Sequence, residues 1–118
     1  MIKKLEISGI HTKLDAKLKA YATEKIGKLD EYLPDHARPS AHAEVKLMTE
    51  KIKARQIHRC EVILFLPHEE IVAKATGDTL IAAIDAAEAK LKPMLRKYKG
   101  RHGRGRLHHR LIGKIRRR

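Results

Sequence analysis

The chain has 118 residues, of which 42% are apolar, so we expect one folded domain with a modest core rather than a disordered chain. Its formal net charge is +13, which favours a polyanionic partner such as nucleic acid or an anionic membrane surface. Its single cysteine, Cys60, excludes an internal disulfide framework, and neither a signal peptide nor an apolar run of the roughly 20 residues of a membrane span is present, so we expect a cytoplasmic protein.

The first predicted elements are a short strand and an amphipathic helix. Residues 2–8 alternate apolar and polar side chains, which is typical of a strand. Thr12 and Asp15 then have the spacing of a helix start. The helix is indicated by apolar side chains that recur every three or four residues, at Leu14, Leu18, Ala22, Ile26, Leu29 and Leu33. Pro34 cannot continue the helix and ends it.

Three strands follow, and they predict a meander. Residues 40–50 turn one face inward, at Ala43, Val45, Leu47 and Thr49. After a basic connection at 51–55, residues 56–67 place Cys60, Val62, Leu64 and Leu66 on one face. Ile63 and Phe65 are apolar on the other face, so we expect this strand to be central or partly covered on both sides. A third strand follows at 70–76.

The last predicted helix begins after Gly77, with Asp78 or Thr79 as its N-cap. Its apolar stripe comprises Leu80, Ile84, Ala87, Leu91, Met94 or Leu95, and Tyr98. Pro93 lies inside this stripe, where a proline costs about 3 kcal/mol. We therefore expect a kink or a break at this point.

The order β-α-β-β-β-α predicts an α+β domain over residues 1–99, in which a four-stranded sheet carries two helices on one face. Residues 100–118 form a basic C-terminal tail with eight lysines and arginines and no acid. We expect this tail to be disordered when the protein is free.

Enzyme signatures are absent from the sequence. There is no P-loop, no dinucleotide-binding fingerprint and no nucleophile elbow, and the glycine-rich stretch at 100–105 follows a helix instead of opening one. His42, His58 and Cys60 could approach one another on neighbouring strands, but no C-x-x-C or H-x₃-H pair anchors a zinc site. Packing is the simpler interpretation, so we expect no enzyme activity, no cofactor, no metal and no small-molecule substrate.

The basic residues carry the strongest functional signal. On the first helix, lysines alternate with acids, as on an ordinary solvated face. On the last helix, Asp85 and Glu88 occupy the first half and bases fill the second half, which the tail extends. The helix dipole favours terminal cations by about 0.3–1 kcal/mol each within the last turn, which leaves the cations beyond it unexplained. A polyanion contact is therefore favoured.

Structured RNA is the polyanion that fits best. An interfacial membrane helix needs exposed large apolar side chains, whereas this helix is rich in alanine and needs its stripe for the sheet, so we expect no membrane partner. Binding of single strands commonly uses aromatic stacking, and the chain has one Phe, three Tyr and no Trp. Recognition of folded RNA through its backbone needs only charge and shape.

Several stretches resemble the family of ribosome hibernation promoting factors and ribosome-associated inhibitors, also labelled sigma-54 modulation or S30EA proteins. They are "TEKIGKLDEYL" (23–33), "EVKL" (44–47), "AAID" (82–85), "KL" (90–91) and "RKYK" (96–99). The resemblance covers residues 1–99 in order. It departs at 79–81, where the family commonly has an acidic-apolar-Tyr triplet, and at Pro93. The chain does not show the C-terminal dimerisation domain of the long family members, so we expect a short form.

The resemblance implies a non-enzymatic factor that binds the small ribosomal subunit, through 16S rRNA, and the 70S ribosome. Such factors cover the decoding region, where tRNA and mRNA would lie, and stabilise idle ribosomes in stationary phase or stress. Family RNA contacts carry over by motif to Lys25, Lys28, Lys90, Arg96, Lys97 and Lys99. Charge alone adds Lys92, Arg101, Arg104 and Arg106. The alternative, from one family label, is a protein-interaction regulator of a sigma factor.

Overall fold

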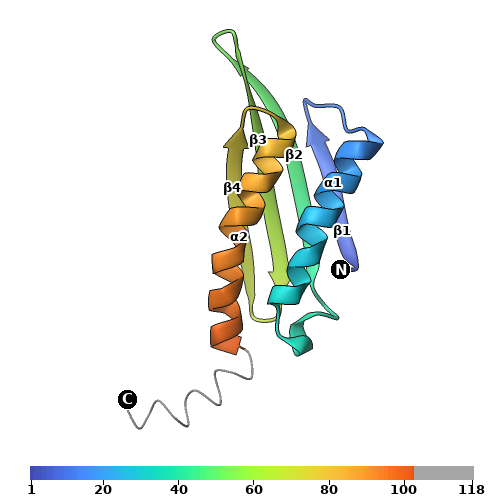
Figure 1. The fold of residues 1–118 in the computed structure, drawn as a ribbon, viewed down its shortest axis with the longest axis vertical. Helices are drawn as coiled ribbons and strands as arrows, with labels where there is room; N and C mark the ends of the chain where they lie inside the picture. Colours follow the sequence, from blue (N-terminus) through green and yellow to red (C-terminus); the bar gives the residue numbers. More distant parts are fainter. Residues whose placement is uncertain (103–118) are drawn as a thin grey trace.

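The computed structural model of the protein describes residues 1–102. In chain order its elements are β1 (Lys4–Ile10), α1 (Ala16–Gly27), the 3₁₀ segments η1 (Lys28–Tyr32) and η2 (Asp35–Ala37), β2 (His42–Ile52), β3 (Arg55–Leu66), β4 (Glu69–Gly77) and α2 (Leu80–His102). The strands form one sheet in the order β1-β2-β3-β4, with β1 parallel to β2 and the other pairs antiparallel (Figure 1). The predicted α+β fold is confirmed.

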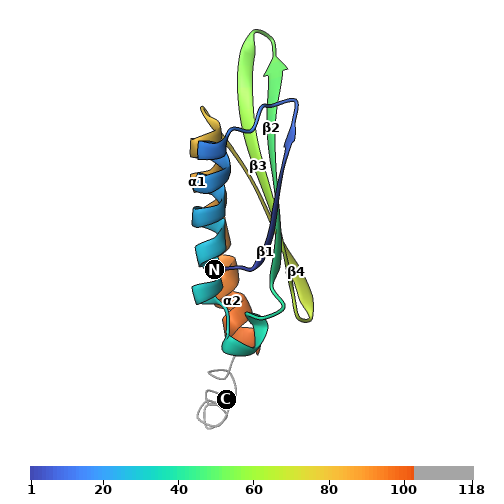
Figure 2. The same ribbon diagram turned by 90° about the vertical axis from the view of Figure 1, so that its right-hand side faces the viewer.

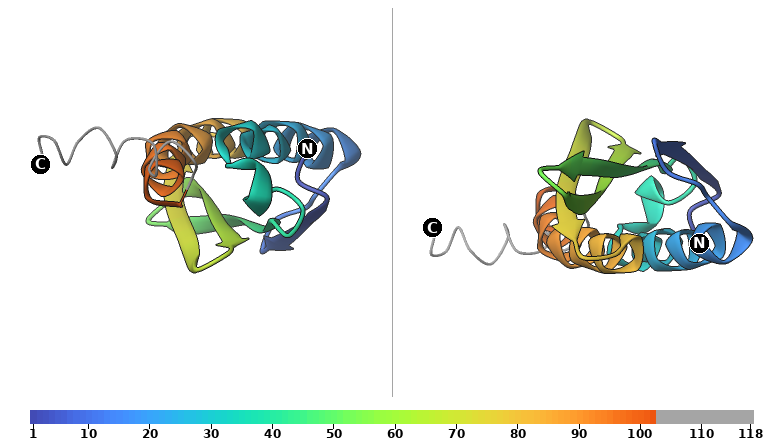
Figure 3. Two further views of the ribbon diagram at one scale, coloured as in Figure 1. Left: turned by 90° about the horizontal axis from the view of Figure 1, so that it is seen from below. Right: turned by 90° about the horizontal axis from the view of Figure 1, so that it is seen from above.

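Both helices cover the same face of the sheet, as predicted (Figure 2). Seen along the long axis, α1 and α2 lie side by side over the strands (Figure 3). The core lies between the two layers, and the predicted inward faces of β2 and β3 are buried there, with Val45, Leu47, Val62 and Leu64 at most 1% exposed. Period-two alternation therefore identified the core side of the sheet correctly.

No helix covers the opposite face of the sheet in the described part of the chain (Figure 2). Ile63 and Phe65 of β3 lie on this face and are only half-buried. Of the two expectations for this strand, the central position is the correct one, because β3 pairs with both β2 and β4. Charged cross-strand pairs flank them. Glu61, for example, lies 3.8 Å from Lys46 and 3.4 Å from Lys74. Acids and bases alternate here, so this face carries no concentrated positive charge.

The first helix begins at its cap, where Asp15 Oδ1 accepts a hydrogen bond of 2.7 Å from the Leu18 amide. Thr12 lies in the preceding loop, and its hydroxyl accepts a bond of 3.0 Å from Thr49 of β2. The α-helix ends at Gly27, earlier than the stripe predicted, and continues as η1. Leu29 and Leu33 remain buried, because the 3₁₀ turn keeps them on the core side.

The second helix runs without a break from Leu80 through Pro93 to His102. Of the two expectations for Pro93, a kink or a break, the break is therefore wrong. Thr79 is the N-cap, since its Oγ1 accepts a 3.0 Å bond from the Ala82 amide. Proline deprives the Ala89 carbonyl of its helical donor, but Ala89 and Pro93 are both exposed, so water can supply one. The helix also includes residues 100–102, which the sequence had placed in the tail.

Candidate nucleic-acid interface

The second half of α2 is anchored by large side chains on both sides of Pro93. Leu91, Leu95 and Tyr98 are each 0% exposed. The Tyr98 hydroxyl donates a 2.8 Å hydrogen bond to the Pro67 carbonyl at the β3–β4 turn, and burial raises the pKa of this phenol. These anchors fix the rotation of the last turns. Arg96, Lys97 and Lys99, which follow the proline, are all exposed.

Three of the predicted residues, Lys92, Arg96 and Lys99, form one stripe along α2 because they are spaced by four and three residues. We call them the α2 basic stripe. Arg96 and Lys99 are exposed and Lys92 is half-buried. Within residues 1–102, none of the three makes an ion pair. Their charges are therefore free to bind an external anion.

The other predicted α2 cations lie toward the edge strand β4. Lys90 Nζ donates a 2.6 Å hydrogen bond to the Lys74 carbonyl. Arg101 donates to Glu69 Oε1 at 3.2 Å from Nε and at 2.6 Å from an Nη. These hydrogen bonds from Arg101 lower the pKa of the Glu69 carboxyl, and His102 contributes to the same effect. Lys97 is exposed above the same edge and has no acid partner in the described chain.

The two predicted first-helix lysines both have partners. Lys25 Nζ lies 3.9 Å from Asp85 and 3.9 Å from Glu88, so it links α1 to α2. Lys28 donates a 2.9 Å bond to Glu24 one turn earlier, which raises the pKa of the lysine and lowers that of the acid. Both are solvent-accessible, but their charges are already balanced locally. Sequence spacing could suggest the Lys28 pair but not the link between the helices.

Asp85, from the "AAID" stretch, has a structural role that the sequence did not reveal. Its Oδ1 accepts a 2.5 Å hydrogen bond from the Tyr21 hydroxyl, which raises the pKa of that phenol to about 12. Lys17 lies one turn before Tyr21 on the same flank of α1 and is exposed. It thus adds a cation beside the helix pair. The i,i+4 spacing of Lys17 with Tyr21 and Lys25 could have indicated it.

Arg104 and Arg106 lie outside the described residues. The structure therefore places eight of the ten predicted residues, and it separates them into three groups. The first group is the α2 basic stripe, which faces away from β4. The second group borders β4 and comprises Lys90, Lys97 and Arg101. The third group comprises Lys25 on α1 and Lys28 on η1. The predicted residues gather around α2, and Lys25 lies 3.9 Å from Glu88, one helical turn before Lys92.

The histidine–cysteine trio cannot bind a metal together. His42 pairs with Phe65 and lies on the open face of the sheet, whereas Cys60 is 1% exposed on the core face. Burial raises the pKa of the Cys60 thiol to about 12, so it remains protonated and packs as a small apolar group.

Within residues 1–102, one group has ligand atoms within 4.8 Å of one another, namely Glu6, His42 and Glu44. The 3.3 Å contact of His42 with Glu6 is an ordinary cross-strand pair. The ring of His42 also packs against Phe65, with centroids 5.2 Å apart. Since packing and pairing explain these positions, we assign no metal to them.

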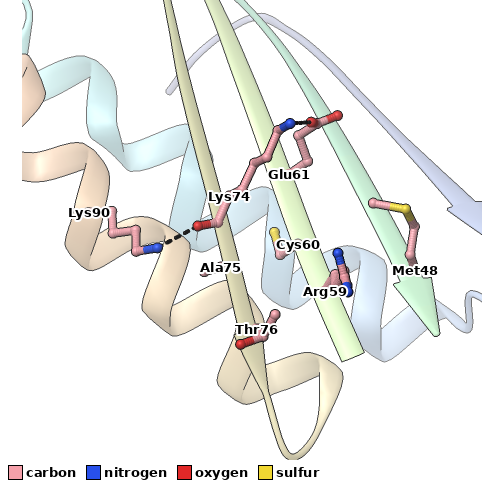
Figure 4. Close-up of a pocket in the computed structure, with 8 residues that line it drawn as sticks. All are labelled: Met48, Arg59, Cys60, Glu61, Lys74, Ala75, Thr76 and Lys90. Atoms are coloured by element: carbon pink, nitrogen blue, oxygen red, sulfur yellow. Dashed lines mark hydrogen bonds and ion pairs between the residues drawn. The ribbon is translucent and has the colours of Figure 1, made fainter. Parts of the chain in front are cut away.

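A hollow beside β4 is too small to be a ligand pocket. It measures about 220 Å³ and is lined by charged side chains of the sheet, including Glu61 and Lys74, together with Lys90 of α2 (Figure 4). Pockets for small molecules generally span about 300–1,000 Å³ and are mostly apolar. In the part of the chain that the structure describes, no helix is long and apolar enough to cross a membrane. The candidate site is therefore an exposed, positively charged surface.

Taken together, the features describe a small α+β domain whose last helix presents Lys92, Arg96 and Lys99, which make no ion pair within residues 1–102. The model of the family "Sigma 54 modulation protein / S30EA ribosomal protein" matches residues 5–103. The chain belongs to this family, which confirms the resemblance seen in the sequence. This membership also supports the expectation that the protein is not an enzyme.

Curated relatives agree with this assignment. The chain is 34% identical over 103 residues to the ribosome hibernation promotion factor of Lactococcus lactis, a match that covers 86% of this chain and 52% of the relative. It is 37% identical over 101 residues to the factor of the same name from Staphylococcus aureus, with coverage of 86% and 50%. This chain thus spans about half the length of these two relatives.

A shorter relative is matched over most of its length. The ribosome hibernation promoting factor of Pseudomonas putida is 30% identical over 95 residues, which covers 80% of this chain and 85% of the relative. Among solved structures, the N-terminal domain of Thermus thermophilus Protein Y superposes with a TM-score of 0.64 at 24% identity, covering 82% of this chain and 97% of that one. A ribosomal subunit interface protein from Coxiella burnetii gives a TM-score of 0.67 at 18% identity, with coverage of 82% and 98%. These two likenesses bear on the fold alone.

Proposed function

We propose that the protein is a ribosome hibernation factor. It binds the small ribosomal subunit and the 70S ribosome in the cytoplasm, keeps idle ribosomes intact in stationary phase or stress, and silences translation. Family membership and the names of the curated relatives support this function. The observation that carries it is the α2 basic stripe, Lys92, Arg96 and Lys99, which lacks internal acid partners in the described chain and is held in place by buried Leu95 and Tyr98.

Binding depends on the neutralisation of RNA phosphates by lysine and arginine side chains, and no catalysed reaction is involved. Each lysine or arginine that contacts an RNA phosphate releases condensed counterions, so affinity falls as salt rises. Lys97 and the α2 basic stripe supply this charge directly. Lys25, Lys28 and Arg101 contribute less, because part of their interaction energy is already used inside the protein. No cofactor is needed for such a mechanism.

Silencing follows from occupancy of the decoding region by a folded domain. A folded α+β domain in that position would exclude tRNA and mRNA from a shared site. Lys25 links α1 to α2 through Asp85 and Glu88, so the two helices can dock as one rigid surface. Competition on purified small subunits tests this step. Prior binding of the protein should block tRNA and mRNA, and unimpeded binding of both would contradict occlusion.

The residue assignment is tested by equilibrium co-sedimentation with small subunits at graded salt. The variant Arg96→Gln/Lys99→Gln should lower the slope of log affinity against log salt by about 1.5, since each lost phosphate contact removes about 0.7–0.9. The matched control is Lys3→Gln/Lys4→Gln, which removes the same charge at the far edge strand and should leave the slope unchanged. Equal slopes for both variants would refute the assignment, and no binding by the wild type would refute the function.

Regulation of a sigma factor is the second candidate, because the family description itself names sigma-54 modulation. Capture of partners from a ribosome-free lysate discriminates the two. A hibernation factor should retain little protein there, whereas stoichiometric retention of a sigma factor would favour the alternative.

A further inference from the structure

The β2–β3 hairpin extends beyond every other element of the sheet. Strand β1 pairs with β2 only as far as Met48, and β4 pairs with β3 only from His58 onward. From Glu50 to Ile57, the residues of β2 and β3 therefore pair only with each other and with no third strand. Figures 1 and 2 show this end of the hairpin projecting past both helices. The sequence could not indicate the projection, because it depends on how far the neighbouring strands pair.

The hairpin tip is basic and exposed. Lys51, Lys53 and Arg55 are all exposed, and none of them makes an ion pair within residues 1–102. The one acid nearby, Glu50, lies 3.0 Å from Arg59 toward the base of the hairpin. Three cations thus stand on a two-stranded ribbon without internal compensation. A solvated protein face normally interleaves both signs of charge, as the open sheet face does here.

The turn itself keeps a cation at the apex. Lys53 and Ala54 have φ values of 49° and 63°, and both positive values are required by the tight hairpin turn of type I′. Asn-Gly is the favoured pair for such a turn, because side chains with a Cβ adopt these angles reluctantly. This chain instead places a lysine there. The turn chemistry therefore does not account for the residue, whereas contact with an anion would.

The tip lies at the opposite end of the molecule from the C-terminal part of α2 (Figure 1). We propose that residues 51–55 form a second RNA-backbone contact, in which Lys51, Lys53 and Arg55 bind phosphates of ribosomal RNA at a distance from those bound by α2. This inference rests on the proposed function. Two separated phosphate contacts would fix the orientation of an elongated domain, which one helix end alone would leave free to rotate.

Phosphate backbone fits this tip better than the other polyanions. The tip has one large apolar side chain, Ile52, which is 43% exposed, so it lacks the apolar face needed to enter a membrane interface. It has no aromatic residue to stack on unpaired bases. A narrow ribbon with cations on its end can instead reach the sugar–phosphate surface of a folded RNA without reading its sequence.

Salt-graded binding to small ribosomal subunits tests the proposal. Replacement of the two tip lysines, Lys51→Gln/Lys53→Gln, should lower the salt slope by about 1.5 and weaken binding about tenfold at physiological salt. The control Lys3→Gln/Lys4→Gln has the same charge change and should behave as wild type. Wild-type binding combined with equal slopes for both variants would overturn the tip contact but leave the hibernation function intact. Failure of the wild type to bind would overturn both.

Site-directed crosslinking identifies what the tip touches. Because Cys60 is buried and its thiol pKa is raised to about 12, a cysteine introduced by Lys53→Cys is the thiol that a photo-crosslinker will label. The labelled protein on small subunits should crosslink to 16S rRNA. Crosslinks to ribosomal proteins alone would overturn the RNA assignment. Circular dichroism of each variant verifies that the exposed substitutions leave the fold unchanged.

Discussion

Replacement of Pro93 by alanine should stabilise the protein without changing how it binds. A proline inside a helix costs about 3 kcal/mol, because it removes one backbone hydrogen bond and crowds the preceding turn. The unfolded chain with alanine is more flexible, and this entropy reduces the gain in stability by about 0.4–1 kcal/mol. The Ala89 carbonyl can also reach water in the wild type, which reduces the penalty further. The net gain for Pro93→Ala is therefore about 1–2 kcal/mol.

Urea unfolding monitored by circular dichroism measures this gain. The substitution Pro93→Ala should also raise the melting temperature by several degrees, because 1 kcal/mol corresponds to roughly 4–8 °C for a domain of this size. The matched control, Lys97→Ala, changes an exposed position of the same helix and should stay within about 0.5 kcal/mol. Unchanged or lower stability of Pro93→Ala would mean that the helix bends to accommodate the proline ring, and the reasoning would fail.

The remaining predictions concern contacts around α2. Tyr98→Phe should cost about 1–2 kcal/mol in urea unfolding, since it leaves the Pro67 carbonyl without its donor, and an unchanged midpoint would show that water replaces it. Asp85→Asn should lower the pKa of Tyr21 from about 12 toward 10.0, as read from the ultraviolet titration of the phenol. Because the folded-state pKa is raised, this contact stabilises the wild type fully below pH 10 and is lost as pH rises toward 12, and an identical alkaline profile in Asp85→Asn would contradict it. Glu69→Gln should release Arg101 and steepen the salt dependence of ribosome binding, and a flatter dependence would show that the pair itself is the binding element.

The sheet and its core were predictable from the sequence because period-two and helical patterns are local signals. Val45 and Leu47 alternate with polar neighbours, Val62 and Leu64 continue the same period of two along β3, and all four are buried on the predicted side. The path of α2 through Pro93 was not predictable. Propensity favours a break there, but the tertiary anchoring of the helix on both sides of the proline overrides it.

The charged residues of the candidate site were predictable from the sequence, but their positions relative to one another were not. Lys25 and Asp85 are far apart in sequence, so no local sequence pattern indicated that this lysine pairs with an acid of the other helix. The α2 basic stripe, in contrast, follows from spacing alone. The projection of Lys53 beyond the sheet depends on strand register, which the pattern of one strand cannot determine.

A cryo-EM map of the protein bound to the small ribosomal subunit tests the central claim most directly. The account predicts α2 from Lys92 to Lys99 lying along 16S rRNA backbone in the path of tRNA and mRNA, with the hairpin tip on a separate stretch of rRNA. A map in which the open face of the sheet lies against the subunit, and α2 faces solvent, would contradict it.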